Sequence, residues 1–310
     1  CIRDRSYSLP KFLLMQALEG SLVALTTPMF PNGDIDYKSL EKLIDWHISE
    51  GTNGIVSVGT TGESATLNFK EHLEVIGFTS KYVNKRIPVI AGTGANSTQE
   101  AIELTQESKS LGADYALLVT PYYNKPNQKG LIAHYESIAD SVEINQILYN
   151  VPSRTACDLL PSSVQVLSNH KNIIGIKEAV DDLDRVNDLI SISKKLEKDF
   201  FIYSGDDPTF EESLELGTNG VISVAANVTP KSISDICSFV KKGNINDARD
   251  LHSKNSELYR LLFVESNPIP VKWMLYKMGM IKNSIRLPLI ELDESYHDEV
   301  LSEMIKLELI

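Results

Sequence analysis

The sequence predicts an α/β fold, a single (β/α)8 TIM barrel with additional C-terminal helices, and three observations lead to that prediction. Eight short apolar runs, rich in β-branched residues, recur about every 25–35 residues from Ser21 onward. Longer segments of helical period separate these runs. Strands that are apolar on both faces suit a parallel sheet covered by helices, and eight such units are the number that closes a barrel.

Each apolar run is expected to form one strand of the barrel. In chain order the runs are SLVALTTP (21–28), GIVSVGTT (54–61), PVIAGTG (88–94), YALLVTP (115–121), NQILYNVP (145–152), IIGIKEA (173–179), FFIYSGDD (200–207) and GVISVAAN (220–227). Several of them end in polar residues. Because barrel active sites lie at the carboxyl ends of the strands, these polar ends are expected to meet in one site.

The segments between the runs are predicted to be crossover helices. SLEKLIDWHISEG (39–51) places apolar residues at i, i+3 and i+4 and ends in glycine, which is a helix stop. TQEAIELTQESKSLG (98–112) repeats this pattern after Ser97, a candidate N-cap.

Helical patterns continue after the eighth run, near 230–242, 245–262, 269–280 and 294–308. One of them closes the barrel. We therefore expect a barrel over 20–242 and a helical subdomain over 243–310 packed on it. The stretch NPIPVKW at 267–273 carries two prolines, which predict a turn before a new helix.

Residues 1–19 are expected to be an N-terminal extension or a fusion-derived segment ahead of a native start at Met15. A signal peptide is the weaker interpretation, because the apolar stretch is short and no A-x-A cleavage site follows.

Composition excludes several classes of protein. The 310 residues are 42% hydrophobic, which indicates a globular chain, and 30 basic against 42 acidic residues give a net charge of −12. Such a surface disfavours nucleic acid and anionic membranes as partners. Cys1, Cys157 and Cys237 lack the spacing of a disulfide framework or a zinc site, so we expect a cytoplasmic protein.

Lys177 is the most informative single residue, because it lies at the end of an otherwise apolar run. Period-two alternation places it on the face of Ile173 and Gly175, and an inward face would direct the amine into the barrel mouth. Burial favours the uncharged form of an amine, which is the nucleophile in Schiff-base chemistry with a ketone. The alternative is a lysine that is solvated or paired with an acid at a frayed strand end.

Tyr149, at the end of the preceding run, is either a core tyrosine or a proton shuttle one strand from Lys177.

The turn GTTGES (59–64) is either an anion cradle or a tight turn before a helix. GTGAN (92–96) has the same two interpretations, and neither segment matches a dinucleotide or nucleotide-phosphate loop.

A magnesium site is the alternative for the acidic residues near the strand ends, Glu63, Glu178, Asp206 and Asp207. Asp206 and Asp207 also fit a capping turn ahead of Pro208. Zinc is not indicated, because the six histidines are scattered. We expect no metal.

The motifs GTTGES, PYYNKP (121–126), YNVPSRT (149–155), IKEA (176–179) and SGDD (204–207) occur in that order. In them the chain resembles the dihydrodipicolinate (4-hydroxy-tetrahydrodipicolinate) synthases, within the pyruvate-dependent class I aldolase family that also contains N-acetylneuraminate lyase. The resemblance runs from about Gly20 to the C-terminal helices. It implies a lyase that condenses pyruvate with L-aspartate 4-semialdehyde on the route to diaminopimelate and lysine.

The resemblance also implies roles for individual residues. Lys177 would form the Schiff base with pyruvate, and Tyr149, Thr60 and Tyr123 would relay protons, Tyr123 reaching into a neighbouring subunit's site. Thr61 would hold the pyruvate carboxylate and Arg154 that of the semialdehyde. The remaining pocket positions would be Gly205 and the backbone carbonyl of Ile222.

A lysine-inhibition site is implied as well, by Ser64, Ala65, His72, Asn96, Glu100 and Tyr122. Phe69 stands where a histidine is often found, and a phenyl ring cannot hydrogen-bond, so the resemblance leaves feedback inhibition by L-lysine open. Ordinary interface and turn residues are the alternative.

The family resemblance further implies a homotetramer built as a dimer of dimers, with no cofactor beyond the covalent pyruvate Schiff base. Three alternative functions stay open at this point: N-acetylneuraminate lyase, a 2-keto-3-deoxy sugar acid aldolase, and a non-catalytic sensor of small acids. The paired threonines at 60–61 and Arg154 favour the synthase over the sialic-acid lyase.

Overall fold

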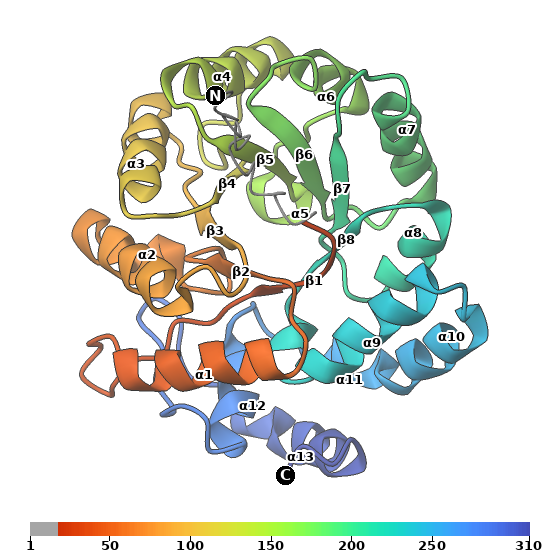
Figure 1. Cartoon of the computed structure of the whole chain (residues 1–310). Coiled ribbons are helices and arrows are strands. Elements are labelled where there is room, and N and C mark those ends of the chain that lie inside the picture. The colour runs from red at the N-terminus through yellow and green to blue at the C-terminus, as the bar shows by residue number, and fades with distance from the viewer. Residues whose placement is uncertain (1–17) are drawn as a thin grey trace, which may run out of the picture.

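The computed structural model of the chain describes residues 18–310. Within that range eight parallel strands close into a barrel, each pairing with the next in sequence and β8 pairing with β1 (Figure 1). The strands are β1 (Gly20–Ala24), β2 (Gly54–Ser57), β3 (Val89–Gly92), β4 (Tyr115–Val119), β5 (Asn145–Asn150), β6 (Ile173–Glu178), β7 (Phe201–Ser204) and β8 (Gly220–Ser223). The predicted barrel is confirmed, and the strands are shorter than the apolar runs because the polar run ends belong to loops.

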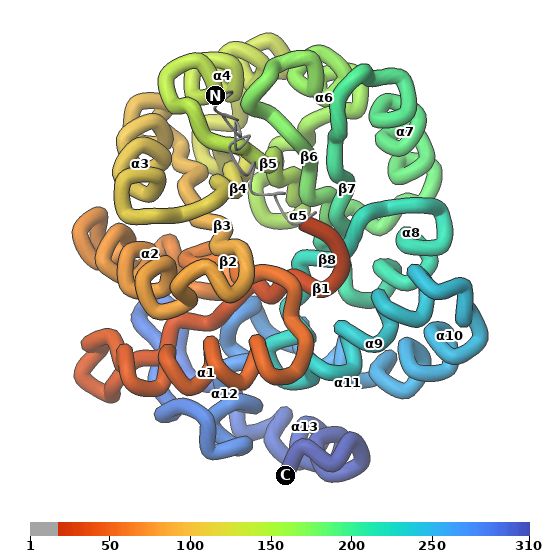
Figure 2. Tube along the Cα trace, viewed as in Figure 1, coloured from red at the N-terminus to blue at the C-terminus, as the bar shows by residue number. Residues whose placement is uncertain are grey.

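Helices surround the barrel, and the trace in Figure 2 runs strand to helix around it before entering the tail. Those between or beside the strands are α1 (Tyr37–Ser49), α2 (Phe69–Val83), α3 (Thr98–Ser110), α4 (Gln128–Ser141), α5 (Pro152–Thr155), α6 (Pro161–Leu167), α7 (Leu183–Ser193), α8 (Phe210–Leu216) and α9 (Pro230–Lys241). The tail forms α10 (Ile245–Lys254), α11 (Ser256–Leu261), α12 (Ile269–Lys277) and α13 (His297–Lys306).

Side-chain caps define where the crossover helices begin. The Ser97 hydroxyl accepts from the Glu100 amide at the start of α3, as the sequence predicts. Helix α1 begins earlier than expected, because the Asp36 carboxylate accepts from the Ser39 amide at 3.0 Å and caps the helix there.

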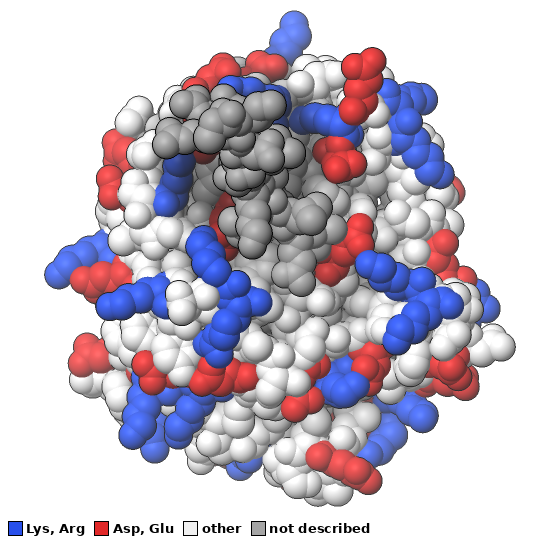
Figure 3. Space-filling model, in the orientation of Figure 1, with Lys and Arg blue, Asp and Glu red and all other residues white. Residues whose placement is uncertain are grey.

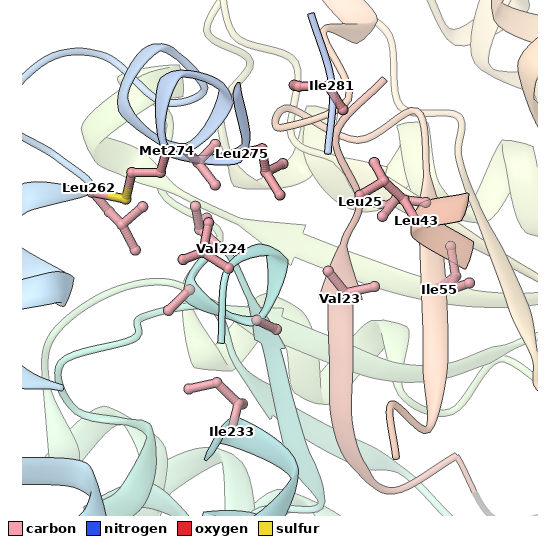
Figure 4. Close-up of a cluster of buried hydrophobic side chains, with 14 of the residues drawn as sticks. Val23, Leu25, Leu43, Ile55, Val224, Ile233, Leu262, Met274, Leu275 and Ile281 are labelled. Carbon is pink, nitrogen blue, oxygen red and sulfur yellow. The ribbon is translucent and has the colours of Figure 1, made fainter. Parts of the chain in front are cut away.

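Two layers of apolar side chains hold the barrel together. The inner layer fills the barrel with strand residues, among them Leu22, Val56, Ile90, Ile147 and Ile222. The outer layer packs strands against helices. In its larger cluster, strands β1 and β2 and helix α1 share a core with the tail helices, as the side chains in Figure 4 show. The division at residue 242 stays a prediction, and most of the expected N-terminal extension lies outside the described residues.

Strand β6 contains an irregularity that the alternation argument did not foresee. Gln146 pairs with Ile173 but the next residue, Ile147, pairs with Gly175, so Ile174 is passed over. Ile173 therefore packs in the outer layer. The prediction that Ile173 and Lys177 share a face is wrong, because the extra residue reverses the alternation between them.

A buried ion pair fastens the tail to the barrel. The Lys272 ammonium on α12 contacts the Glu63 carboxylate in the turn after β2 and donates to the Thr27 carbonyl at 3.1 Å. The second Glu63 oxygen accepts from the Arg286 amide at 3.1 Å. Burial lowers the pKa of Lys272, and the neighbouring Glu63 charge opposes that shift.

The surface carries both signs of charge. Lys and Arg side chains are interspersed with Asp and Glu on the face shown in Figure 3. Among the helices described here, none has the length and apolar character needed to cross a membrane.

Replacing Lys272 should destabilise the fold strongly. Lys272→Met leaves the buried Glu63 carboxylate without its cation, and we expect a loss of about 3–5 kcal/mol in the free energy of unfolding. Urea unfolding at constant protein concentration measures it. Lys70→Met is the matched control, because Lys70 lies 3.5 Å from Glu74 on the exposed surface, where a pair contributes about 0–1 kcal/mol. Equal losses in the two variants would refute the role of the buried pair.

Candidate active site

A cavity of about 860 Å³ opens where the carboxyl ends of the strands meet the tail. The apolar ends of β1, β2 and β4 form part of its wall. The polar lining comes from β5, β6, the loops that follow the strands, helix α11, and the segment between α11 and α12. It includes Thr60, Thr61, Tyr149, Arg154, Lys177, Asp206, Tyr259 and Asn267. The polar strand ends therefore do meet in one place.

Lys177 lies on β6 with its side chain in this cavity, although only 5% of the residue is exposed. Its Cα is paired in register with that of Tyr149 on β5, and its Nζ lies 4.4 Å from the centre of the Tyr149 ring. Within residues 18–310 no carboxylate forms an ion pair with this amine. The frayed, solvated end considered as an alternative does not occur.

Gly205 allows the Lys177 side chain to lie where it does. A Cβ at Gly205 would come within 2.7 Å of Lys177 Cε and 2.8 Å of Ala179 Cβ. The Gly205 amide also donates to the Glu178 carbonyl, which ties the loop after β7 to the end of β6. Glycine is therefore required here by close packing against the amine's own chain.

Glu178 fixes the end of β6 from the opposite side. Its buried carboxylate accepts from Arg185 Nε at 2.8 Å and from Asn150 Nδ2 at 3.0 and 3.2 Å. Burial raises the pKa of Glu178 to about 7, and the Arg185 guanidinium and the Asn150 amide oppose that rise. Arg185 also binds Asp158, so the loop after β5 joins the same network.

The turn after β2 presents two hydroxyls to the cavity. Thr60 is partly exposed, whereas Thr61 is 1% exposed and its hydroxyl oxygen accepts from Asn267 Nδ2 at 2.9 Å. The Thr27 hydroxyl, in the loop after β1, donates to the Gly62 carbonyl and ties the turn to that loop. This rigid turn suits the proposed anion cradle.

Of three further residues expected at the site, one lines the cavity and two do not. Arg154 lies on α5, lines the cavity and donates to the Asn267 carbonyl at 3.4 Å. Ile222 lies in the barrel core and is not part of the cavity wall. Tyr123 is 87% exposed on the outer surface and is also not part of that wall.

A second cavity of about 310 Å³ lies beside the first. It is lined by all six residues predicted for an effector site, Ser64, Ala65, His72, Asn96, Glu100 and Tyr122. Phe69 lines it too. The two cavities share Thr60, Val151 and Arg154 in their walls.

The acidic residues near the strand ends do not assemble a metal site. Asp207 accepts from the Val224 and Ala225 amides, and Asp206 accepts from the amide and hydroxyl of Thr209. In the described part of the chain, no three His, Cys, Asp or Glu side chains lie where they could hold one ion. Asp206 and Asp207 are thus engaged by backbone and hydroxyl donors. Asp206 closes the turn ahead of α8, and Thr209 holds the N-cap position of that helix without a side-chain cap.

Sequence reasoning did not identify Asn267, Arg185 or Lys272 as part of the site's framework. Lys272 carried the same signal as Lys177, a lysine within an apolar run, and could have been found by it. Asn267 lies in NPIPVKW, where only the prolines were interpreted. No pattern in the sequence pairs it with Thr61, which is 206 residues away.

Comparison with known proteins agrees with the arrangement. Residues 17–307 match the model of the dihydrodipicolinate synthetase family. The 4-hydroxy-tetrahydrodipicolinate synthase of Stutzerimonas stutzeri is 54% identical over 287 residues, 93% of this chain and 97% of the relative.

Two solved structures are similar as well. The chloride-inhibited dihydrodipicolinate synthase of Acinetobacter baumannii, complexed with pyruvate, is 50% identical with a TM-score of 0.91, covering 94% of this chain and 100% of that one. The enzyme of Cyanidioschyzon merolae with lysine bound is 36% identical with a TM-score of 0.90, covering 94% and 99%.

Proposed function

The chain belongs to the dihydrodipicolinate synthetase family and is a lyase with 4-hydroxy-tetrahydrodipicolinate synthase activity, and we propose that the cavity around Lys177 carries out this reaction. Pyruvate and L-aspartate 4-semialdehyde are the proposed substrates. The observation that supports the site best is the buried Lys177 amine, unpaired with any described carboxylate and facing the Tyr149 ring.

Lys177 Nζ attacks the ketone carbon of pyruvate, and loss of water leaves an imine. Removal of a methyl proton then gives an enamine, whose carbon forms the new bond to the aldehyde carbon of the semialdehyde while the aldehyde oxygen gains a proton. The amino group of the semialdehyde then attacks the imine carbon, which closes the ring and releases Lys177 as the free amine. The reaction needs no cofactor beyond this covalent link. The apolar wall formed by Ala24, Val56 and Leu117 suits the methyl group of pyruvate.

Tyr149 is the proposed acid and base beside the imine, since a phenol can both give and take a proton. Thr60 lines the same cavity and would pass protons onward. Tyr123 is the third proposed member of the relay. Its exposure on the surface of the single chain supports a role in a neighbouring subunit's cavity.

The carboxylates of the two substrates have separate proposed partners. The Thr61 turn would hold pyruvate, and the Arg154 guanidinium, a planar bidentate donor, would hold the semialdehyde. Gly205 leaves room for the Lys177 chain. Ile222 would contribute its backbone carbonyl, as the resemblance implies, and its side chain packs in the barrel core.

The synthase activity is favoured over N-acetylneuraminate lyase, sugar acid aldolase and sensor functions, because relatives about 54% identical over nearly the full chain are synthases. The cytoplasmic location expected from the cysteines remains a proposal, and cell fractionation would check it.

Borohydride reduction in the presence of pyruvate should attach a stable adduct to Lys177, which peptide mass spectrometry would locate. Lys177→Ala should remove the adduct and reduce kcat by about 10³-fold or more, because the covalent path is lost. The surface variant Lys70→Ala should keep both. An adduct on another lysine, or turnover by Lys177→Ala at the wild-type rate, would contradict the proposal.

We propose a homotetramer assembled from dimers in which Tyr123 crosses between subunits. Tyr123→Phe should lower kcat by about 10²–10⁴-fold. Co-expressed with Lys177→Ala, it should regain activity, because a hybrid dimer pairs an intact Lys177 with an intact Tyr123 from its partner. No recovery in hybrids, or a fully active monomer in light scattering, would refute the shared site.

We propose that the second cavity binds L-lysine, through the Glu100 carboxylate and the Asn96 amide, with Phe69 covering the aliphatic chain. Glu100→Gln should raise the lysine concentration for half-inhibition by about tenfold, since an ion pair is lost. Phe69→His should lower it by restoring a hydrogen-bonding ring. Inhibition that neither variant changes would place the effector elsewhere.

A further inference from the structure

We propose that Asn267 is a positioning residue that sets the direction in which the Thr61 hydroxyl donates its hydrogen. The proposal rests on the proposed function, in which Thr61 binds the pyruvate carboxylate. Asn267 lies between α11 and α12, is 5% exposed and lines the cavity.

The contact between the two side chains has a defined polarity. Asn267 Nδ2 lies 2.9 Å from Thr61 Oγ1, and an amide nitrogen can only donate. The Thr61 oxygen is therefore the acceptor, and its own hydrogen is left for another partner. A carboxylate can only accept, so this arrangement presents the hydrogen in the form that the substrate requires.

Contacts with neighbouring residues hold both Thr61 and Asn267 in place. Thr61 is 1% exposed within a turn that Thr27 and Glu63 hold, and Lys272, five positions after Asn267, anchors the tail to Glu63. The Asn267 carbonyl accepts from Arg154. One residue of the tail therefore contacts the proposed partners of both substrate carboxylates, one through its side chain and one through its backbone.

The opposite orientation of the amide would have the opposite effect. Asn267 Oδ1 would then accept the Thr61 hydrogen and withdraw it from the substrate. In the observed orientation Oδ1 has no hydrogen-bond partner among the described residues. Aspartate at this position can only accept, so Asn267→Asp reproduces the withdrawn state with nearly the same shape.

A double-mutant cycle tests the coupling. The apparent dissociation constant of pyruvate is obtained from borohydride trapping on Lys177 at increasing pyruvate, which requires no turnover. Thr61→Val and Asn267→Ala should each raise it about tenfold, and the double variant should raise it no further than the larger single effect. Additive effects, near a hundredfold together, would overturn the proposal.

Further variants separate positioning from folding and from charge. Thr61→Ser keeps the hydroxyl and should keep near-normal affinity. Asn169→Ala, an exposed asparagine that lines neither cavity, is the matched control. Asn267→Asp should weaken pyruvate in the wild-type background but not in Thr61→Val. If its effect persists without the Thr61 hydroxyl, charge repulsion is the cause and the proposal fails. Thermal unfolding of each variant establishes that it is folded.

Turnover gives an independent readout. Asn267→Ala should raise the KM for pyruvate more than that for the semialdehyde, because the backbone carbonyl that contacts Arg154 is retained. An equal rise in both would overturn the side-chain role. No adduct on the wild-type chain would refute the proposed function itself, whereas normal adduct formation with additive effects would refute only this inference.

Discussion

The buried ion pair between Lys272 and Glu63 is the constraint on which the site depends. It joins residues 209 positions apart and brings the tail against the turn that carries Thr60 and Thr61. A barrel strand defines the direction of its own side chains, but a turn does not. The tail therefore completes the cavity, because it supplies both the anchor and the Asn267 amide that contacts Thr61.

Lys177 and Lys272 show how one sequence signal leads to two different roles. Both are lysines within apolar runs, and both are almost fully buried. Lys272 meets a carboxylate and a carbonyl, so its charge is compensated and its role is structural. Lys177 meets an aromatic ring, and Gly205 leaves space along its chain. The neighbour that the fold supplies decides between the roles, and no local pattern encodes that neighbour.

Periodicity in the sequence was sufficient for the barrel, since every predicted strand and crossover helix depends on local pattern. It was also sufficient to gather Lys177, Tyr149 and Arg154 at one cavity, because parallel strand ends share one rim. It failed for Ile173, where a single extra residue shifts the register of β6. It could not place Asn267, whose partner lies across the whole barrel, nor foresee that Tyr123 stays on the outer surface of one chain.

The net charge of −12 bears on how anionic substrates can bind, and therefore on the state of the acidic residues near the cavity. Both proposed substrates are anions, so the long-range field opposes their approach and affinity must come from short-range donors. Asp206, on the cavity wall, is engaged by Thr209, and burial raises its pKa, which disfavours its charged form. Glu178 is held by Arg185 and Asn150. Burial therefore weakens the Asp206 charge that would repel the substrates, although the hydrogen bonds from Thr209 act in the opposite direction. Arg185 compensates the Glu178 charge. Arg154 and the Thr61 turn are the proposed partners of the two carboxylates.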